Sequence, residues 1–166
     1  MNKKQNFTAI FKSPVGYLGI LIDGKTLAGL EFLGRKKPLA EVAADSNEVT
    51  IKAVSVALKH YFNDPCHVGQ PGIVLNGTAF QKKIWKALSL IKPGKTRTYG
   101  DIARELKTSP RAVGNACRSN PVPIFIPCHR VVSTSGRGGF MGRTSGEPLA
   151  IKEWLLVHEQ KAAAGK

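Results

Sequence analysis

The sequence predicts an α/β (α+β) protein in which a small N-terminal α/β domain with an antiparallel sheet precedes a mostly helical C-terminal domain. Short apolar runs separated by turn residues fill residues 7–34, which is typical of strands joined by hairpins. Apolar side chains at helical spacing recur through the second half. Between these regions, residues 64–77 are rich in proline and glycine and indicate a linker. We therefore expect domains at residues 1–76 and 77–166.

The expected strands are residues 7–11, 17–22 and 27–33. Ser13-Pro14 and Asp23-Gly24 lie between them, and Asp-Gly is a strong hairpin signal. Residues 49–62 predict a helix that Pro65 ends. Its inward side chains would be Ile51, Val54, Ala57, Leu58 and Tyr61.

The second half predicts three helices in close succession. The first has its apolar stripe at Phe80, Ile84, Ala87, Leu88 and Ile91 and ends at Pro93-Gly94. Thr98 and Asp101 match a capping box, which would start a second helix with Ile102, Ala103 and Leu106 inside. Ser109-Pro110 starts the third, with serine as the N-cap and proline in the first turn.

The second and third of these helices resemble a winged helix-turn-helix-like DNA-binding motif. On the third helix, Val113, Ala116 and Cys117 would face inward, whereas the outward face would be Arg111, Asn115 and Arg118. The small residues Ala112 and Gly114 would allow close approach to a backbone, as a recognition helix requires. A plain helical hairpin with a solvated basic face remains the alternative.

The charge is strongly positive and unevenly distributed. The chain of 166 residues carries a net charge of +14, with 9 basic and 6 acidic residues in residues 1–76 and 16 basic and 5 acidic in residues 77–166. A polyanionic partner such as nucleic acid, or an anionic membrane surface, would suit this charge; a solvated basic surface is the alternative.

Cysteine usage and hydropathy indicate the compartment. Three cysteines, Cys66, Cys117 and Cys128, make no paired disulfide framework. The first residues lead into no signal-type apolar run, and no stretch approaches the roughly 20 apolar residues of a membrane span. We expect a cytoplasmic protein with reduced thiols and no membrane partner.

Two local patterns suggest chemistry. Cys128 stands beside His129 and Arg130, straight after the proline-bounded apolar residues 121–127. A cysteine held by stiff backbone beside a base is suited to nucleophilic attack, although a free cysteine that merely precedes a histidine is the alternative. In a helix expected at residues 148–160, Glu159 falls on the apolar stripe, where a carboxylate is costly unless it has a partner; the alternative is a frayed last turn that leaves it in water.

Read together, these motifs resemble the O6-alkylguanine-DNA alkyltransferases, also called methylated-DNA–protein-cysteine methyltransferases, over about residues 78–160. Asn-Pro-Val-Pro followed by Ile-Pro-Cys-His-Arg is highly specific. The matching segments are Phe80-Gln81, Ile84-Trp85, Thr98 to Ala103, Arg111 to Gly114, Asn120 to Val132 and Lys152 to Glu159.

The resemblance implies DNA repair by direct damage reversal. Cys128 would take the alkyl group from O6-alkylguanine irreversibly, so that each molecule acts once; O4-alkylthymine is left open as a second substrate. By position, His129 would draw off the thiol proton through a water, Glu159 would orient His129, and Asn120 would brace the turn that holds the cysteine. Such a nucleophile–base–orienter chain requires its carboxylate.

The family also assigns roles around the base. Tyr99 matches the tyrosine that donates a proton to the leaving guanine, and Arg111 matches the arginine that fills the vacated base stack. Ala112 and Gly114 belong to the helix that the family places in the minor groove. The carbonyl of Val131 would hold the guanine amine.

The pocket wall departs from the family pattern. The family usually carries a Gly-Tyr-x-Gly-Gly loop, whereas this chain has Gly139-Phe140-Met141-Gly142-Arg143, with Phe140 in place of the tyrosine and Arg143 in place of the last glycine. Phe140 keeps the aromatic wall without its hydroxyl, and Arg143 adds charge. Lys152 matches a family lysine near the pocket; its alternative is a solvated helix residue.

The resemblance implies no cofactor and a double-stranded DNA partner containing alkylated bases. We expect a monomer and leave cooperative binding along DNA open. We also expect no metal, because Cys66, His60 and His67 are too few and badly spaced for a closed four-ligand zinc site. The main alternative is a non-catalytic sensor of the alkyltransferase-like type, but such proteins replace the acceptor cysteine. A helix-turn-helix transcription factor would leave residues 120–132 unexplained, and a cysteine hydrolase fits the basic half poorly.

Overall fold

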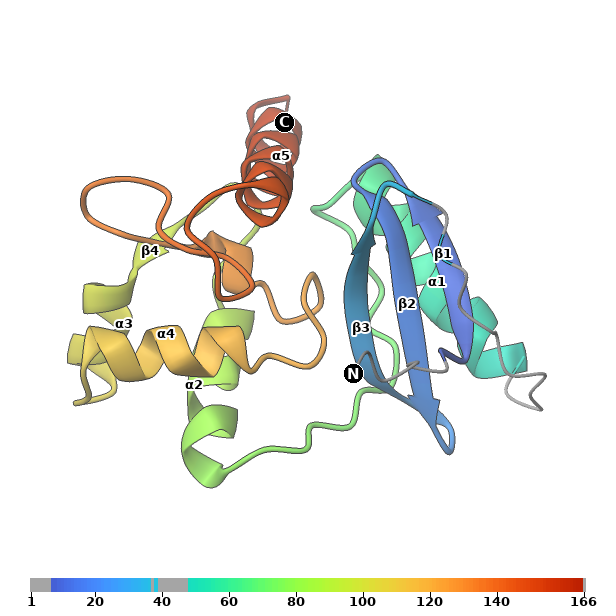
Figure 1. Cartoon of the computed structure of the whole chain (residues 1–166), viewed down its shortest axis with the longest axis horizontal. Helices are drawn as coiled ribbons and strands as arrows, with labels where there is room; N and C mark the ends of the chain where they lie inside the picture. Colours follow the sequence, from blue (N-terminus) through green and yellow to red (C-terminus); the bar gives the residue numbers. More distant parts are fainter. Residues whose placement is uncertain (1–6, 37, 39–47, 166) are drawn as a thin grey trace. The chain divides into compact units, whose positions relative to one another are not determined.

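The computed structural model describes residues 7–36, 38 and 48–165. The first six residues, which bear on the expectation of no signal segment, lie outside this described part. The chain divides into two compact units, Met1–Asn76 and Gly77–Lys166 (Figure 1). Among the described residues, no helix is both long and apolar enough to cross a membrane.

The first unit is an antiparallel three-stranded sheet with one helix. Strands β1 (Ala9–Ser13), β2 (Gly16–Asp23) and β3 (Thr26–Gly34) lie in the order β1-β2-β3, and α1 (Glu48–Asn63) packs against the sheet (Figure 1). The core residues include Leu18, Ile20, Leu30, Val54, Leu58 and Tyr61. This arrangement confirms the predicted sheet and its helix.

The predicted hairpin joins β2 to β3. Asp23 pairs with Thr26, so Gly24 and Lys25 form the turn, and Gly24 adopts a φ of 57° that favours glycine. Part of the expected linker also belongs to this unit. The chain after α1 returns beside β3, where the amide of Leu27 donates to the carbonyl of Gly72 at 2.8 Å.

The second unit is mostly helical. Its elements are α2 (Ala79–Ser89), β4 (Arg97–Thr98), α3 (Tyr99–Glu105), α4 (Pro110–Arg118), the 3-10 helix η1 (Cys128–Arg130), β5 (Val131–Val132) and α5 (Glu147–Ala164). Strands β4 and β5 pair in parallel, and α3 packs against α4. The parallel pair brings the start of α3 beside the segment that follows Cys128.

The helix starts agree with the predicted caps. Thr98 Oγ1 accepts from the amide of Asp101 at 3.0 Å, while Asp101 Oδ2 accepts from the amide of Thr98 at 2.9 Å. Ser109 Oγ accepts from the amide of Ala112 at 3.2 Å, with Pro110 in the first turn. Because both caps are fixed by local side chains, the sequence was sufficient to predict them.

The apolar stripe predicted for α2 is wrong at its first residue, Phe80. Phe80 is 41% exposed, whereas Trp85 is 1% exposed and donates from Nε1 to the carbonyl of Ala116 on α4 at 2.8 Å. The packing of α4 selects the face that contains Trp85, which turns the first residues of α2 outward. The helix also ends at Ser89, earlier than the predicted stop at Pro93-Gly94.

We expect Trp85→Phe to destabilise the second unit by about 1–3 kcal/mol, because it removes the buried indole donor to the Ala116 carbonyl, which then keeps only the Ser119 hydroxyl. Urea unfolding followed by circular dichroism measures the change. Leu90→Ala is the control: Leu90 is 75% exposed, so its loss should stay within about 0.5 kcal/mol. Equal effects of the two substitutions would contradict the role given to the Trp85 hydrogen bond.

Candidate active site

Cys128 begins η1 at the end of a tightly folded segment. Cys128 is 6% exposed, and its amide donates to the carbonyl of Ile126 at 2.8 Å. Within the segment, Ile124 has a φ of 77°, which is strained for a β-branched side chain. The surrounding fold therefore holds the backbone before the cysteine in a conformation that this sequence alone would not favour.

Asn120 ties both ends of that segment together. Its Oδ1 accepts from the amide of Val122 at 3.0 Å, and its Nδ2 donates to the carbonyl of Ile126 at 2.8 Å. The Asn120 side chain also forms a hydrogen bond that favours the thiolate of Cys128. One amide group thus fixes the turn and contacts the nucleophile at its end.

His129 and Glu159 form a fully buried pair. His129 Nε2 lies 2.7 Å from Glu159 Oε1, and both side chains are 0% exposed. The alternative of a frayed helix end is wrong, because α5 continues to Ala164. An ionised carboxylate can only accept, so Nε2 carries the proton in this pair.

Arg130, which the sequence interpretation did not include in the site, neutralises Glu159. Its Nε and Nη2 each donate to a different carboxylate oxygen at 2.9 Å, and its Nη1 donates to the carbonyl of Ile91. The amide of Gly94 adds a donor to Oε2 at 3.2 Å. The only sequence signal was the position of Arg130 directly after His129.

The protonation states follow from burial and these partners. Burial alone would raise the pKa of Glu159, but the hydrogen bonds and charges of His129 and Arg130 outweigh it and hold the pKa far below its usual range. Burial lowers the pKa of His129 despite the nearby carboxylate. It also raises the pKa of Cys128, which the Asn120 hydrogen bond and the charge of Lys152 oppose only in part. At rest, both thiol and imidazole are therefore neutral.

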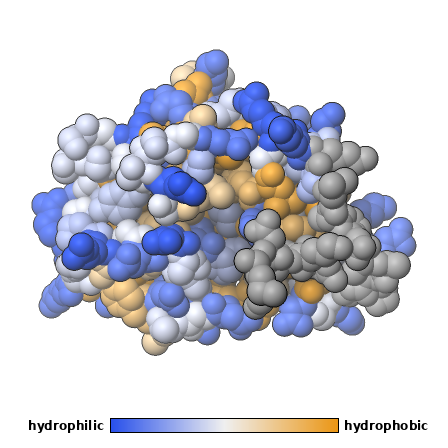
Figure 2. Space-filling model, viewed as in Figure 1, coloured by the Kyte–Doolittle hydropathy of each residue, from blue (hydrophilic) through white to orange (hydrophobic). Residues whose placement is uncertain are grey.

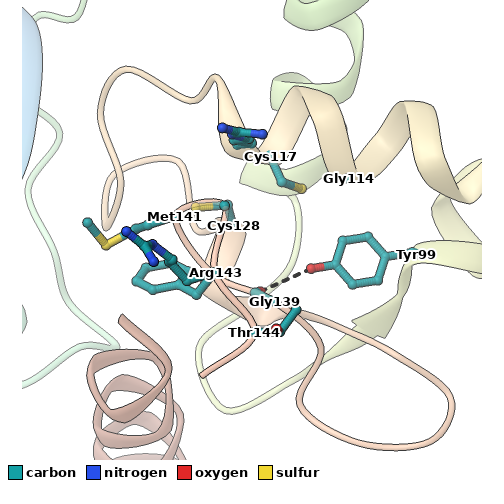
Figure 3. A pocket seen from close by; sticks show the side chains of 11 residues that line it. Tyr99, Gly114, Cys117, Cys128, Gly139, Met141, Arg143 and Thr144 are labelled. Atoms are coloured by element: carbon teal, nitrogen blue, oxygen red, sulfur yellow. Dashed lines mark hydrogen bonds between the residues drawn. The ribbon is translucent and has the colours of Figure 1, made fainter. Parts of the chain in front are cut away.

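Cys128 lines a cavity of about 240 Å³. The walls come from α3, α4 and the loop before α5, and they include Tyr99, Gly114, Cys117, Phe140 and Met141. Figure 3 shows Cys128 between Tyr99 on one side and Arg143 and Met141 on the other. Cys117 joins the site without having been predicted there, and burial raises the pKa of its thiol.

A second cavity of about 440 Å³ adjoins the first. The two share Tyr99 and Gly114, and the second is also lined by Pro110, Arg111 and Ser133. Arg111 is exposed at the start of α4. Ala112 is half-buried and lines neither of these two cavities.

Lys152 fastens the loop that closes the first cavity. It is fully buried, so the alternative of a solvated helix residue is wrong. Its Nζ donates to the carbonyls of Val131 at 2.6 Å and Gly139 at 2.9 Å, and the Tyr99 hydroxyl donates to the same Gly139 carbonyl at 3.3 Å. Burial lowers the pKa of Lys152 to about 8 and raises that of Tyr99. The Val131 carbonyl, expected to face guanine, already accepts this lysine.

The tip of the loop is a two-residue turn. Phe140 and Arg143 exchange both backbone hydrogen bonds, at 2.8 and 2.9 Å. Met141 and Gly142 between them have φ values of 52° and 75°, as in a type I′ turn. Phe140 is buried, whereas Met141 is 40% exposed. The departure from the family loop is therefore a well-formed hairpin that lines the cavity.

The visible surface of the second unit in Figure 2 is mostly polar. On the face of the second unit seen in Figure 2, hydrophilic side chains predominate and hydrophobic ones form small patches. Within the described part of the chain, no group of three or more His, Cys, Asp or Glu side chains could hold a metal ion.

Comparison with known proteins agrees with these features. Residues 79–161 match the family model described as "6-O-methylguanine DNA methyltransferase, DNA binding domain". A methylated-DNA–protein-cysteine methyltransferase of Methanosarcina acetivorans is 38% identical over 92% of this chain and 97% of its own length. That of Cricetulus griseus is 35% identical over 94% of this chain and 82% of its own length.

Solved structures give the same result. The crystal structure of Mycobacterium tuberculosis O6-methylguanine methyltransferase matches with a TM-score of 0.76 and 30% identity over 92% of each chain. The same organism's protein in complex with DNA gives a TM-score of 0.75 and 31% identity, again over 92% of each chain. These matches cover both units of the chain, as well as the motifs around Cys128. The chain therefore belongs to the methylated-DNA–protein-cysteine methyltransferase family.

Proposed function

We propose that this protein repairs DNA by direct reversal, with Cys128 as the single-use acceptor of the alkyl group of O6-alkylguanine. The observation that carries the proposal is the placement of Cys128 at a base-sized cavity, directly before a histidine that is hydrogen-bonded to a buried carboxylate. Sulfur is a strong nucleophile toward saturated carbon once it has lost its proton. The arrangement therefore suits alkyl transfer to sulfur, and because the thioether that results is stable, each molecule acts once.

Proton removal is the first step. The Cys128 thiol passes its proton, through a water, to Nδ1 of neutral His129, because Nε2 already carries a proton for Glu159. Glu159 keeps the imidazole oriented and stabilises its charged form as it appears, while Arg130 holds the carboxylate in place. The thiolate is thereby formed when the substrate is present and not before.

Displacement is the second step. A sulfur–carbon bond forms while the bond between the alkyl carbon and guanine O6 breaks, and the electron pair leaves with the guanine. The raised pKa of Tyr99 keeps its hydroxyl protonated, so that it can donate to the negative charge that develops on the base. Asn120 holds the attacking sulfur in place.

The target base must leave the duplex to reach Cys128. We infer that α4 enters the minor groove, where Gly114 permits close approach and exposed Arg111 fills the vacated stack. Phe140 and Met141 would then enclose the alkyl side of the base. All residues of this scheme lie in the second unit of a single chain. The protein would therefore act as a monomer on double-stranded DNA that contains alkylated bases.

A non-catalytic sensor of alkylated bases is the competing function. It would need the same DNA surface and base cavity, but neither an acceptor thiol nor a base beside it. The Cys128, His129 and Glu159 arrangement favours transfer over sensing.

Incubation with duplex DNA that contains one O6-methylguanine should add one methyl group to the peptide containing Cys128, in a one-to-one ratio. Mass spectrometry of the digested protein measures it. Cys117→Ala, which removes the other thiol of the cavity, should still be methylated, and Cys128→Ala should bind the DNA without methylation. Methylation at Cys66 or Cys117, or turnover beyond one equivalent, would refute the mechanism.

Arg111→Ala should slow methyl transfer from duplex DNA about tenfold or more, yet barely change the reaction with free O6-benzylguanine, which needs no extrusion. Single-turnover rates on the two substrates provide the comparison. Arg104→Ala, also an exposed arginine but on α3, is the matched control. Equal losses on both substrates would show that Arg111 does not act through base extrusion.

A further inference from the structure

The arginines of the second unit fall into two groups. Four form ion pairs with carboxylates: Arg97 with Glu105, Arg104 with Asp101, Arg130 with Glu159 and Arg137 with Glu153. Within the described residues, Arg111, Arg118 and Arg143 have no such partner. These three are also the arginines that line the two cavities.

Two of the unpaired arginines line the cavity of Cys128. Arg118 comes from the end of α4, and Arg143 from the turn at the tip of the loop. A Cβ atom built on Gly142 would lie only 2.7 Å from Arg118 Nε, so the Arg118 side chain packs directly on that turn. None of the residues that line this cavity is acidic.

The position of Arg143 would bring it close to the alkyl group of the substrate and not to the guanine ring. In Figure 3, Tyr99 and Arg143 lie on opposite sides of Cys128. If Tyr99 serves the guanine, as proposed above, the base occupies its side of the sulfur. The substituents of the reacting carbon then project sideways from the line that joins O6, carbon and sulfur, into the cavity that Met141, Arg143 and Arg118 also line.

We propose that Arg118 and Arg143 form an anion subsite that selects O6-alkylguanines whose alkyl group ends in a carboxylate, such as O6-carboxymethylguanine. Charge-assisted hydrogen bonds from guanidinium to carboxylate are among the stronger polar contacts in proteins. The same guanidinium groups could instead meet a DNA phosphate, which has the same anionic oxygen chemistry. The reaction is unchanged: Cys128 attacks the methylene carbon, the bond to O6 breaks, and S-carboxymethylcysteine and guanine result.

This inference rests on the proposed function, and its test separates the two. Duplexes carrying O6-methylguanine, O6-carboxymethylguanine or its neutral amide, O6-(carbamoylmethyl)guanine, are compared in single-turnover reactions. The quantity measured is the rate of transfer from O6-carboxymethylguanine divided by the rate from O6-(carbamoylmethyl)guanine. A general effect on DNA binding changes both rates equally and cancels in this ratio. Failure of the wild-type protein to methylate Cys128 would refute the proposed function itself.

Arg143→Gln and Arg118→Gln should each lower that ratio about tenfold, because a hydrogen bond to a charged group is lost. Arg143→Lys should keep part of the preference for the carboxylate, because it keeps the positive charge. Arg104→Gln, which removes the same charge away from the cavity, should leave the ratio at the wild-type value. The free bases O6-carboxymethylguanine and O6-(carbamoylmethyl)guanine, which carry no phosphate, should show the same loss. An unchanged ratio would overturn the proposal; if the carboxylate and amide rates also fall equally on duplex DNA, the arginines serve DNA phosphate instead.

Discussion

The buried carboxylate of Glu159 is the group on which the second unit depends. It accepts hydrogen bonds from His129, from two nitrogens of Arg130 and from the amide of Gly94, so it joins α5, η1 and the turn before β4. Arg130 extends the network to the carbonyl of Ile91. Leaving a charge of this kind unpaired in the interior would cost several kcal/mol. The bidentate arginine removes that cost and fixes the backbone that carries Cys128.

The same network resolves a conflict between burial and reactivity. Enclosing Cys128 excludes water from the transfer but raises the pKa of the thiol, which opposes formation of the nucleophile. Because Glu159 and Arg130 neutralise each other, His129 can remain an uncharged base in the interior. Lys152, held by two carbonyls, supplies a positive charge that favours the thiolate. The reactivity of Cys128 therefore comes from the neutral imidazole of His129, which can accept the thiol proton, and not from a permanently ionised sulfur.

The features that sequence predicted best are governed by neighbouring residues. The caps at Thr98 and Ser109 and the turn at Gly24 depend on a few adjacent side chains and on backbone conformation, so local patterns sufficed. The exposed position of Phe80 and the bidentate bond of Arg130 were missed because each depends on segments far apart in the chain; Arg130 meets Glu159 across 29 positions. Family motifs named Cys128, His129 and Glu159 together and placed Arg143 in the pocket wall, but no local rule indicated that Cys117 and Arg118 would line the same cavity.

The proposed mechanism requires His129 to be a neutral base whose Nε2 proton is held by Glu159. Nitrogen-15 NMR of the histidine ring, with His129→Gln used to assign its signals, measures the protonation of each nitrogen directly. At about pH 7 we expect a protonated Nε2 and an unprotonated Nδ1, with titration only below the ordinary histidine pKa of about 6.5, because burial lowers the pKa of His129. A doubly protonated ring at that pH, or a proton on Nδ1 with Nε2 bare, would contradict it.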